Sequence, residues 1–254
     1  MHMPPEAVYV LNRRVYKESS LILDVFSLNY GRLSIIANGA LKSKKAWSAM
    51  LQVFQPLLIV WAGRSSLKTL VSIEAPSKAM TLSGNRLFSA YYLNELLLKL
   101  VPQDQGESVS FNSSESFIAY SKTLEDLSNS EDIERPLRIF EYQLLTELGV
   151  FPDSNSDLNG QEIRPEIVYT LVPQEGFKPV NVSIVSNKPS RGLLIEGRYL
   201  IDLPNILESD FEFTGSFLKQ IKRLMRSLIG ELLGGQVLKS RSLFQTYKPF
   251  RSVT

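Results

Sequence analysis

The chain has 254 residues, of which 44% are hydrophobic and 21% are charged, and it contains no cysteine and a single histidine, His2. This length and composition describe a globular protein with one large domain or two smaller ones. The lack of cysteine excludes disulfides and thiolate zinc sites, and one histidine near the start argues against histidine-based catalysis.

Charge is segregated along the chain. Residues 1–80 carry 10 lysines and arginines against 4 acidic residues, and residues 209–254 carry 8 against 3. Such basic ends indicate contact with anions, although an uneven distribution of solvated charge would give the same pattern. No apolar run is long enough to span a bilayer, and residues 1–20 lack the apolar core of a signal peptide, so we expect a cytoplasmic protein with no membrane contact.

The first 80 residues predict a small β-barrel without a helix. Leu21, Leu23 and Val25 alternate with residues that face the other way, which is typical of a strand with one buried face. Arg13–Ser19 reads as a polar turn. The expected strands are residues 7–12, 21–26, 33–37, 51–61 and 67–74. Five short antiparallel strands hide their edges most economically by closing into a barrel of the OB type, a fold that commonly binds single-stranded nucleic acid.

A loop after the second hairpin strand is the first candidate binding element. It holds three lysines, Lys42, Lys44 and Lys45, followed by Trp47. Cations neutralise phosphates, and an indole, with Tyr30 as a further aromatic, can stack on bases. We interpret this loop as a nucleic-acid-binding element that contacts both phosphates and bases.

The rest of the chain predicts helices around a less regular insertion. A buried helix is expected from the Ser83 cap to Pro102, a weaker one at 117–127, and a third with Pro136 in its first turn and Gly149 at its end. The later elements are residues 167–172 and 193–201 as strands, a helix from Thr214 to Gly234, and a short helix at 238–244. The predicted fold class is α+β, with an OB-fold barrel at 1–80 and a helical domain at 81–254 whose irregular or β insertion covers about 151–208.

Two helical surfaces are candidates for binding partners. Arg138, Tyr142 and Leu145 follow helical spacing, and a cation beside apolar side chains could receive an acidic, apolar peptide end; alternatively, neighbouring elements bury Tyr142 and Leu145. The second surface is the basic side of the last long helix, which could contact DNA or be only a solvated face: Lys219, Lys222, Arg223 and Arg226.

The sequence lacks the motifs of common enzyme sites. It has no Walker-type glycine loop, no dinucleotide fingerprint and no nucleophile elbow. The carboxylates of the barrel, from Asp24 to Glu74, are too scattered for a two-metal nuclease site. We therefore predict no enzyme activity, no cofactor and no metal.

Several segments are similar, in order, to the RecO family of bacterial recombination-mediator proteins, in its cysteine-poor proteobacterial branch. They are YVLNRRVYKESSLILDVFSLNYGRLSIIANGALKSKK, LQVFQPLLIVWAGRSSLKTL, LSGNRLFSAYYLNELLLKLVP, ERPLRIFEYQLLTELGV and LKSRSLFQTY. The resemblance implies an OB domain and a helical domain that together bind single- and double-stranded DNA and anneal complementary strands. It also implies contact with the acidic C-terminal tail of single-stranded DNA-binding protein, cooperation with RecR in loading RecA, and a cytoplasmic location at the nucleoid.

The resemblance also suggests where the sites lie. The family's basic DNA-binding face falls on Arg13, Arg14, Arg32, Lys42, Lys44 and Lys45. Its tail-binding site lies in the helical domain, where we place it at Arg138, Tyr142 and Leu145. Many relatives carry a four-cysteine zinc module near residues 151–160, which this cysteine-free chain does not match. Two alternatives stay open: an adaptor with only incidental DNA contact, and an OB-fold RNA-binding protein.

Overall fold

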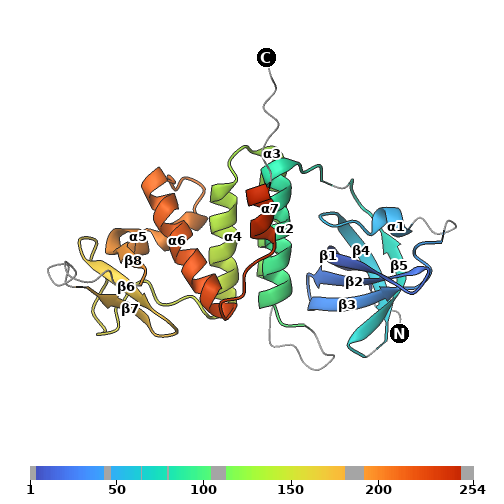
Figure 1. Cartoon of the computed structure of the whole chain (residues 1–254), viewed down its shortest axis with the longest axis horizontal. Coiled ribbons are helices and arrows are strands. Elements are labelled where there is room, and N and C mark those ends of the chain that lie inside the picture. Colours follow the sequence, from blue (N-terminus) through green and yellow to red (C-terminus); the bar gives the residue numbers. More distant parts are fainter. Residues whose placement is uncertain are drawn as a thin grey trace, which may run out of the picture. The chain divides into compact units, whose positions relative to one another are not determined.

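The structure is a computed structural model, and it describes residues 4–42, 47–63, 65–78, 80–103, 113–180 and 192–246. The chain forms two compact units (Figure 1). The first, called the barrel unit below, comprises Met1–Ile133 and Leu238–Thr254, and the second unit comprises Glu134–Val237. The predicted division into domains at residue 80 stays a prediction.

Five strands form the barrel, and their order confirms the predicted OB-type closure. They are β1 (Glu6–Tyr16), β2 (Ser20–Ser27), β3 (Gly31–Ala37), β4 (Pro56–Ala62) and β5 (Leu67–Glu74). The closed order is β1-β2-β3-β5-β4, with β1 and β4 antiparallel and β3 and β5 parallel. Leu23 and Ile35 are 0% exposed and point into the core. The alternation seen in the sequence is therefore the inside–outside alternation of the barrel wall.

Three predictions for this region were wrong in detail. Arg13–Tyr16 is not a turn: β1 continues through it because β2 pairs with it as far as Tyr16 opposite Ser20. The strand expected at 51–61 begins only at Pro56, which lacks a backbone donor and stands at a strand's first position. A four-residue helix, α1 (Trp47–Met50), precedes it where no helix was expected.

A bulge in β1 joins the barrel to its helices. The register of β1 shifts between Val10 and Asn12, which leaves the carbonyl of Leu11 without a strand partner. Asn94 Nδ2 donates to this carbonyl at 2.8 Å, and Asn94 Oδ1 accepts from the Tyr120 hydroxyl at 2.6 Å. Asn94 lies in α2 (Gly84–Leu100) and Tyr120 in α3 (Ser114–Asn129). One buried amide therefore connects a strand and two helices.

A short C-terminal helix, α7 (Ser240–Thr246), returns to α2. The Glu95 carboxylate accepts hydrogen bonds from Lys239 N at 2.9 Å, Ser240 N at 2.8 Å and Ser240 Oγ at 2.7 Å. These donors lie at the start of α7, where a helix leaves its first N–H groups unpaired. Glu95 therefore caps α7 and fixes it to the barrel unit.

The second unit packs two helices beside a small sheet. Its elements are α4 (Glu134–Glu147), β6 (Val168–Val172), β7 (Gly176–Pro179), β8 (Leu194–Glu196), α5 (Gly197–Ile201), the 3-10 helix η2 (Leu203–Leu207) and α6 (Gly215–Leu232). The sheet order is β7-β6-β8. The strand expected at 193–201 was wrong beyond Glu196, because α5 occupies its second half.

Candidate nucleic-acid interface

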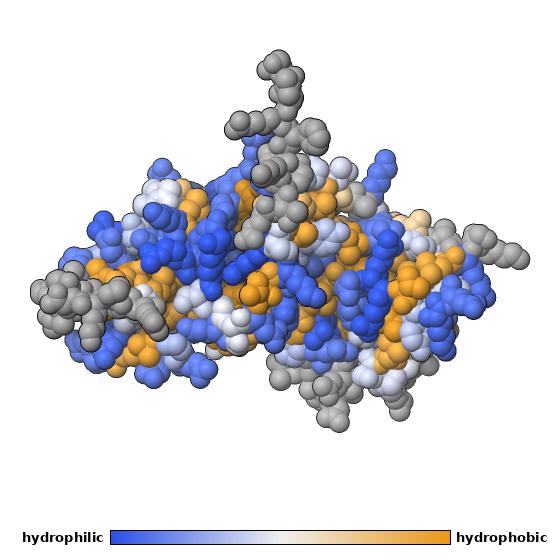
Figure 2. Space-filling model, viewed as in Figure 1, coloured by the Kyte–Doolittle hydropathy of each residue, from blue (hydrophilic) through white to orange (hydrophobic). Residues whose placement is uncertain are grey.

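Arg14 lies on the outer face of the barrel. Residues directly opposite each other on neighbouring strands face the same side of a sheet. Arg14 pairs with Ile22, which pairs with Ile36, and this row alternates with the row that fills the core. Arg14 is exposed. Figure 2 shows hydrophobic and hydrophilic residues side by side on the visible face of the barrel.

Lys42 lies at the same end of the barrel as Arg14. The turn that follows β3 meets the turn between β1 and β2, because Leu41 N donates to Ser19 O at 3.0 Å. Lys42 comes directly after this contact and is exposed. The fold therefore brings two of the predicted DNA-binding residues, from β1 and from the turn after β3, to one surface.

Arg13 lies at the same end of the barrel as Arg14 and Lys42, but its side chain also stabilises the structure. Its Nη1 donates to the carbonyls of Ser48 and Leu51 at 3.3 and 3.2 Å. The last carbonyls of a helix lack partners within the helix, so the guanidinium satisfies the end of α1. Removing Arg13 would therefore loosen α1 as well as remove a charge.

The aromatic residues predicted to stack on bases pack against the barrel. Trp47 is half-buried and lies against the core cluster of the barrel. Tyr30 is also half-buried, with its ring 5.3 Å from that of Trp61 in an edge-to-face arrangement. Part of the surface of each ring is therefore buried by packing within the protein. Lys44 and Lys45 lie outside the described residues.

Arg32 lies at the other end of β3 from Lys42. It pairs with Phe26, and its Nε donates to the Val101 carbonyl at 3.0 Å. Burial lowers the pKa of Arg32, and the nearby Asp24 carboxylate opposes this effect. The structure thus separates Arg32 from the other predicted DNA-binding residues and uses it to fix the end of α2.

Two exposed residues at the β1–β2 turn were missing from the predicted set. Tyr16 is 39% exposed, and the Nζ of Lys17 lies 5.3 Å from the centre of its ring. Lys17 has a φ of 53°, the left-handed conformation of a tight turn. The adjacent Tyr-Lys pair in a polar stretch was the available signal, and it places another cation and an aromatic beside Arg14.

The basic side of α6 is mostly exposed. The helix begins where the sequence predicts, and Thr214 caps it by accepting from Phe217 N at 3.2 Å. Lys219, Arg223 and Arg226 are exposed, whereas Lys222 is half-buried and pairs with Glu134 at the start of α4. Three of the four predicted cations therefore share an open face of the second unit.

The predicted tail-binding residues lie on α4, but only one is partly exposed. Leu145 is 0% exposed, and Arg138 is 4% exposed with its Nη1 2.9 Å from Glu141 Oε2. Tyr142 is half-buried, its ring centre is 5.0 Å from that of Phe151, and burial raises the pKa of its hydroxyl while a hydrogen bond with Thr146 opposes the rise. The sequence reasoning overlooked the carboxylate one turn along the helix that makes burial of Arg138 acceptable.

Searches for other chemistry in the described part of the chain gave negative results. Among the described residues, no three acidic side chains gather as candidate metal ligands. None of its helices combines the length and the apolar character needed to cross a membrane.

Comparison with known proteins gives a consistent family assignment. Residues 1–77 match the family model described as recombination protein O N terminal, and residues 82–242 match that of recombination protein O C terminal. The DNA repair protein RecO of Aliivibrio fischeri is 38% identical over 238 residues, covering 93% of each chain. That of Methylococcus capsulatus is 35% identical over 259 residues, covering 96% of this chain and 99% of the relative. With its closed N-terminal barrel and matches across both parts, this chain belongs to the RecO family of DNA repair proteins.

Proposed function

We propose that this chain is a non-enzymatic DNA-binding recombination mediator. It anneals complementary strands and, together with RecR, helps to load RecA onto DNA coated by single-stranded DNA-binding protein, in the cytoplasm at the nucleoid. The observation that carries the proposal is the basic end of a closed OB-type barrel in a chain of the RecO family. The family supports a role in DNA repair, and the barrel supplies a surface suited to nucleic acid.

The proposed mechanism uses charge and needs no nucleotide. Arg14, Lys17 and Lys42 lie exposed at one end of the barrel and neutralise phosphates, which releases counterions. A second basic face on α6 holds another stretch of DNA through Lys219, Arg223 and Arg226. A protein with two such faces lowers the repulsion between two polyanions and so favours pairing of complementary strands.

The first test measures the salt dependence of single-stranded DNA binding. Changing Arg14, Lys17 and Lys42 together to glutamine should reduce the slope of log affinity against log salt by up to about three units. The matched control changes three exposed lysines elsewhere to glutamine: Lys78, Lys122 and Lys178. Arg13 is left intact because it also holds α1. Equal slopes for the two triple variants would remove this end of the barrel from the DNA interface.

The second test measures annealing of two labelled complementary oligonucleotides coated with single-stranded DNA-binding protein, with or without its acidic tail. Annealing that needs no nucleotide but depends on the tail supports both DNA binding and a tail site. We propose this site around Arg138, Tyr142 and Leu145, and Tyr142→Ala should weaken tail binding because Tyr142 is its partly exposed member. No annealing would favour the adaptor, and stronger binding to matched RNA would favour an RNA-binding role.

A further inference from the structure

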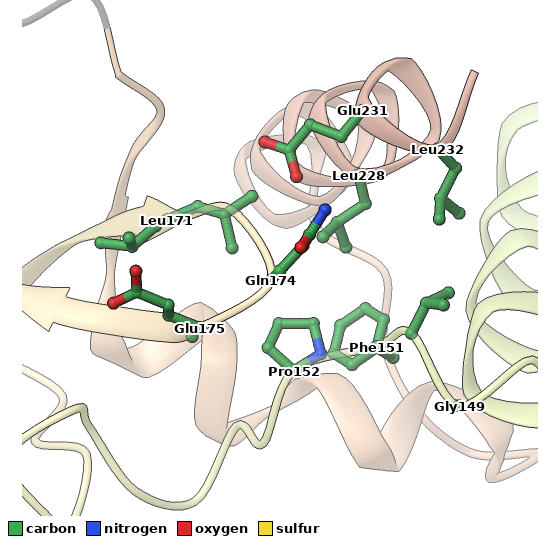
Figure 3. Close-up of a pocket in the computed structure, with 12 residues that line it drawn as sticks. Gly149, Phe151, Pro152, Leu171, Gln174, Glu175, Leu228, Glu231 and Leu232 are labelled. Atoms are coloured by element: carbon green, nitrogen blue, oxygen red, sulfur yellow. The ribbon is translucent and has the colours of Figure 1, made fainter. Parts of the chain in front are cut away.

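A pocket of about 420 Å³ lies within the second unit, away from the basic face of α6. Three segments form it: the end of α4 with the residues after it, the turn between β6 and β7, and the last turn of α6 (Figure 3). None of the proposed DNA-binding residues lines this pocket, but it borders the proposed tail site, because its lining residue Phe151 packs against Tyr142.

Local backbone geometry shapes two of the three walls. Gly149 has a φ of +68°, which ends α4 and lets Val150 N donate to Leu145 O at 3.1 Å. Across the pocket, Gln174 has a φ of 60° in a turn closed by a hydrogen bond from Glu175 N to Val172 O at 3.2 Å. Backbone hydrogen bonds thus fix both of these turns at the edge of the pocket.

The lower wall of the pocket is apolar. In Figure 3 the Phe151 and Pro152 rings lie opposite Leu228, and Leu232 lies at one side. Val150 and Leu232 are 38% and 41% exposed, so apolar surface reaches the mouth of the pocket. Burying such surface against a partner is favourable by about 25 cal/mol per Å².

Two glutamates from different segments line the pocket. In Figure 3, Glu231 extends from α6 at the top of the view, and Glu175 lies on the turn between β6 and β7, at the lower left. Burial raises the pKa of Glu231, so the charged form is disfavoured where it stands. Glu231 also occupies the last turn of α6, where the carbonyl end of the helix repels an anion and attracts a cation. A bound cation would relieve both effects.

We propose that this pocket binds a peptide segment of a partner protein in which a lysine or arginine stands beside a bulky apolar side chain. The apolar side chain fills the space between Phe151 and Leu228. The cation lies beside Glu231, near the C-terminal carbonyls of α6, and Glu175 adds negative charge to the same pocket. The same acidic rim repels phosphate and acidic peptides, so the ligand is of opposite charge to DNA and to an acidic tail.

The test measures fluorescence anisotropy of labelled probe peptides with the full chain. The probe GSRLFRSG should bind with a dissociation constant below about 100 μM, and the acidic counterpart GSELFESG should bind at least about tenfold more weakly. Replacing Leu-Phe in the probe by Gly-Gly should also weaken binding. No binding of the first probe, or equal binding of the first two, would overturn the proposal.

Variants of the chain locate the binding. Glu175→Gln combined with Glu231→Gln should weaken the basic probe about tenfold, and Leu232→Ser about fivefold. The matched control, Glu166→Gln with Glu212→Gln, neutralises two exposed glutamates outside the pocket and should leave binding unchanged. Equal losses in both double variants would show general electrostatic attraction and overturn the proposal. Self-association of the chain that only the pocket variant abolishes would make a second copy the occupant, and would overturn it too.

Discussion

Asn94 should be among the residues on which the stability of the barrel unit depends most. Asn94→Leu removes the donor to the Leu11 carbonyl at 2.8 Å and the acceptor of the Tyr120 hydroxyl at 2.6 Å. Asn94 is 2% exposed and Tyr120 is 0% exposed, so water cannot replace either partner. Each buried polar group left unpaired costs about 1–3 kcal/mol, and the added apolar contact of leucine offsets part of the loss. We expect a net destabilisation of about 3 kcal/mol.

Tryptophan fluorescence during urea unfolding measures how much Asn94→Leu destabilises the barrel unit. The chain has 2 tryptophans, and both Trp47 and Trp61 lie in the barrel unit. With a typical slope of about 2 kcal/mol per molar urea, the midpoint should fall by about 1.5 M.

A double-mutant cycle provides the control. Tyr120→Phe alone should cost about 1 kcal/mol, because it leaves the side-chain oxygen of Asn94 unpaired. Adding this change to Asn94→Leu removes a hydroxyl that has already lost its hydrogen bond to Asn94, so the double variant should be more stable than the sum of the single losses predicts, by about 1–2 kcal/mol. Additive losses, or a loss below about 1 kcal/mol for Asn94→Leu, would refute the connecting role assigned to this amide.

Three further predictions concern helix ends and a buried ion pair. Burial alone would raise the pKa of Glu95, but the hydrogen bonds from Ser240 and Lys239 outweigh it and lower the pKa. The charged Glu95 carboxylate therefore stabilises the folded chain fully above the ordinary carboxyl pKa range, and this stabilisation is lost as the pH falls through the lowered pKa. Glu95→Gln should destabilise the barrel unit by about 1–2 kcal/mol at pH 7 and by progressively less as the pH falls through the lowered pKa, as urea midpoints across a series of acidic pH values would show. Arg138→Ala breaks the buried ion pair between Arg138 and Glu141 and should cost about 3–5 kcal/mol by hydrogen exchange of α4 amides, whereas Arg138→Met with Glu141→Leu should come within about 1 kcal/mol of the original. Gly149→Ala meets no atom within 4 Å, so only the positive φ opposes it; faster exchange at the end of α4 should indicate a loss of about 1 kcal/mol, and unchanged exchange would contradict the strain argument.

The barrel was predictable because its signal is local. Alternating apolar residues such as Leu21, Leu23 and Val25 set the faces of each strand, and five short strands leave few ways to hide their edges. The end of α4 at Gly149 was equally predictable, because glycine is favoured after the last residue of a helix. What failed were boundaries that depend on distant partners. β1 runs on to Tyr16 because β2 offers it a partner, which a polar sequence alone does not reveal.

The candidate site was only partly predictable for the same reason. The excess of basic residues in the first 80 positions indicated that the barrel binds DNA. Which of these lysines and arginines are exposed and able to bind phosphate depends on contacts with residues distant in sequence. Arg13 and Arg32 donate to carbonyls 35 or more positions away, and Lys222 pairs with Glu134. The burial of Arg138 could have been foreseen, because Glu141 stands one helical turn away on the same face.

The return of α7 to α2 makes the barrel unit discontinuous in sequence. A ribosome releases residues 1–133 long before residues 238–246 are synthesised. During synthesis the Glu95 carboxylate and the adjacent face of α2 therefore lack the contacts that α7 later makes with them. A fragment that stops at residue 133 would stay in that unfinished condition. We expect that the barrel unit folds on its own when residue 133 is joined to residue 238 through a short flexible linker. Glu134–Val237 would then be an insertion that the barrel unit does not need for folding.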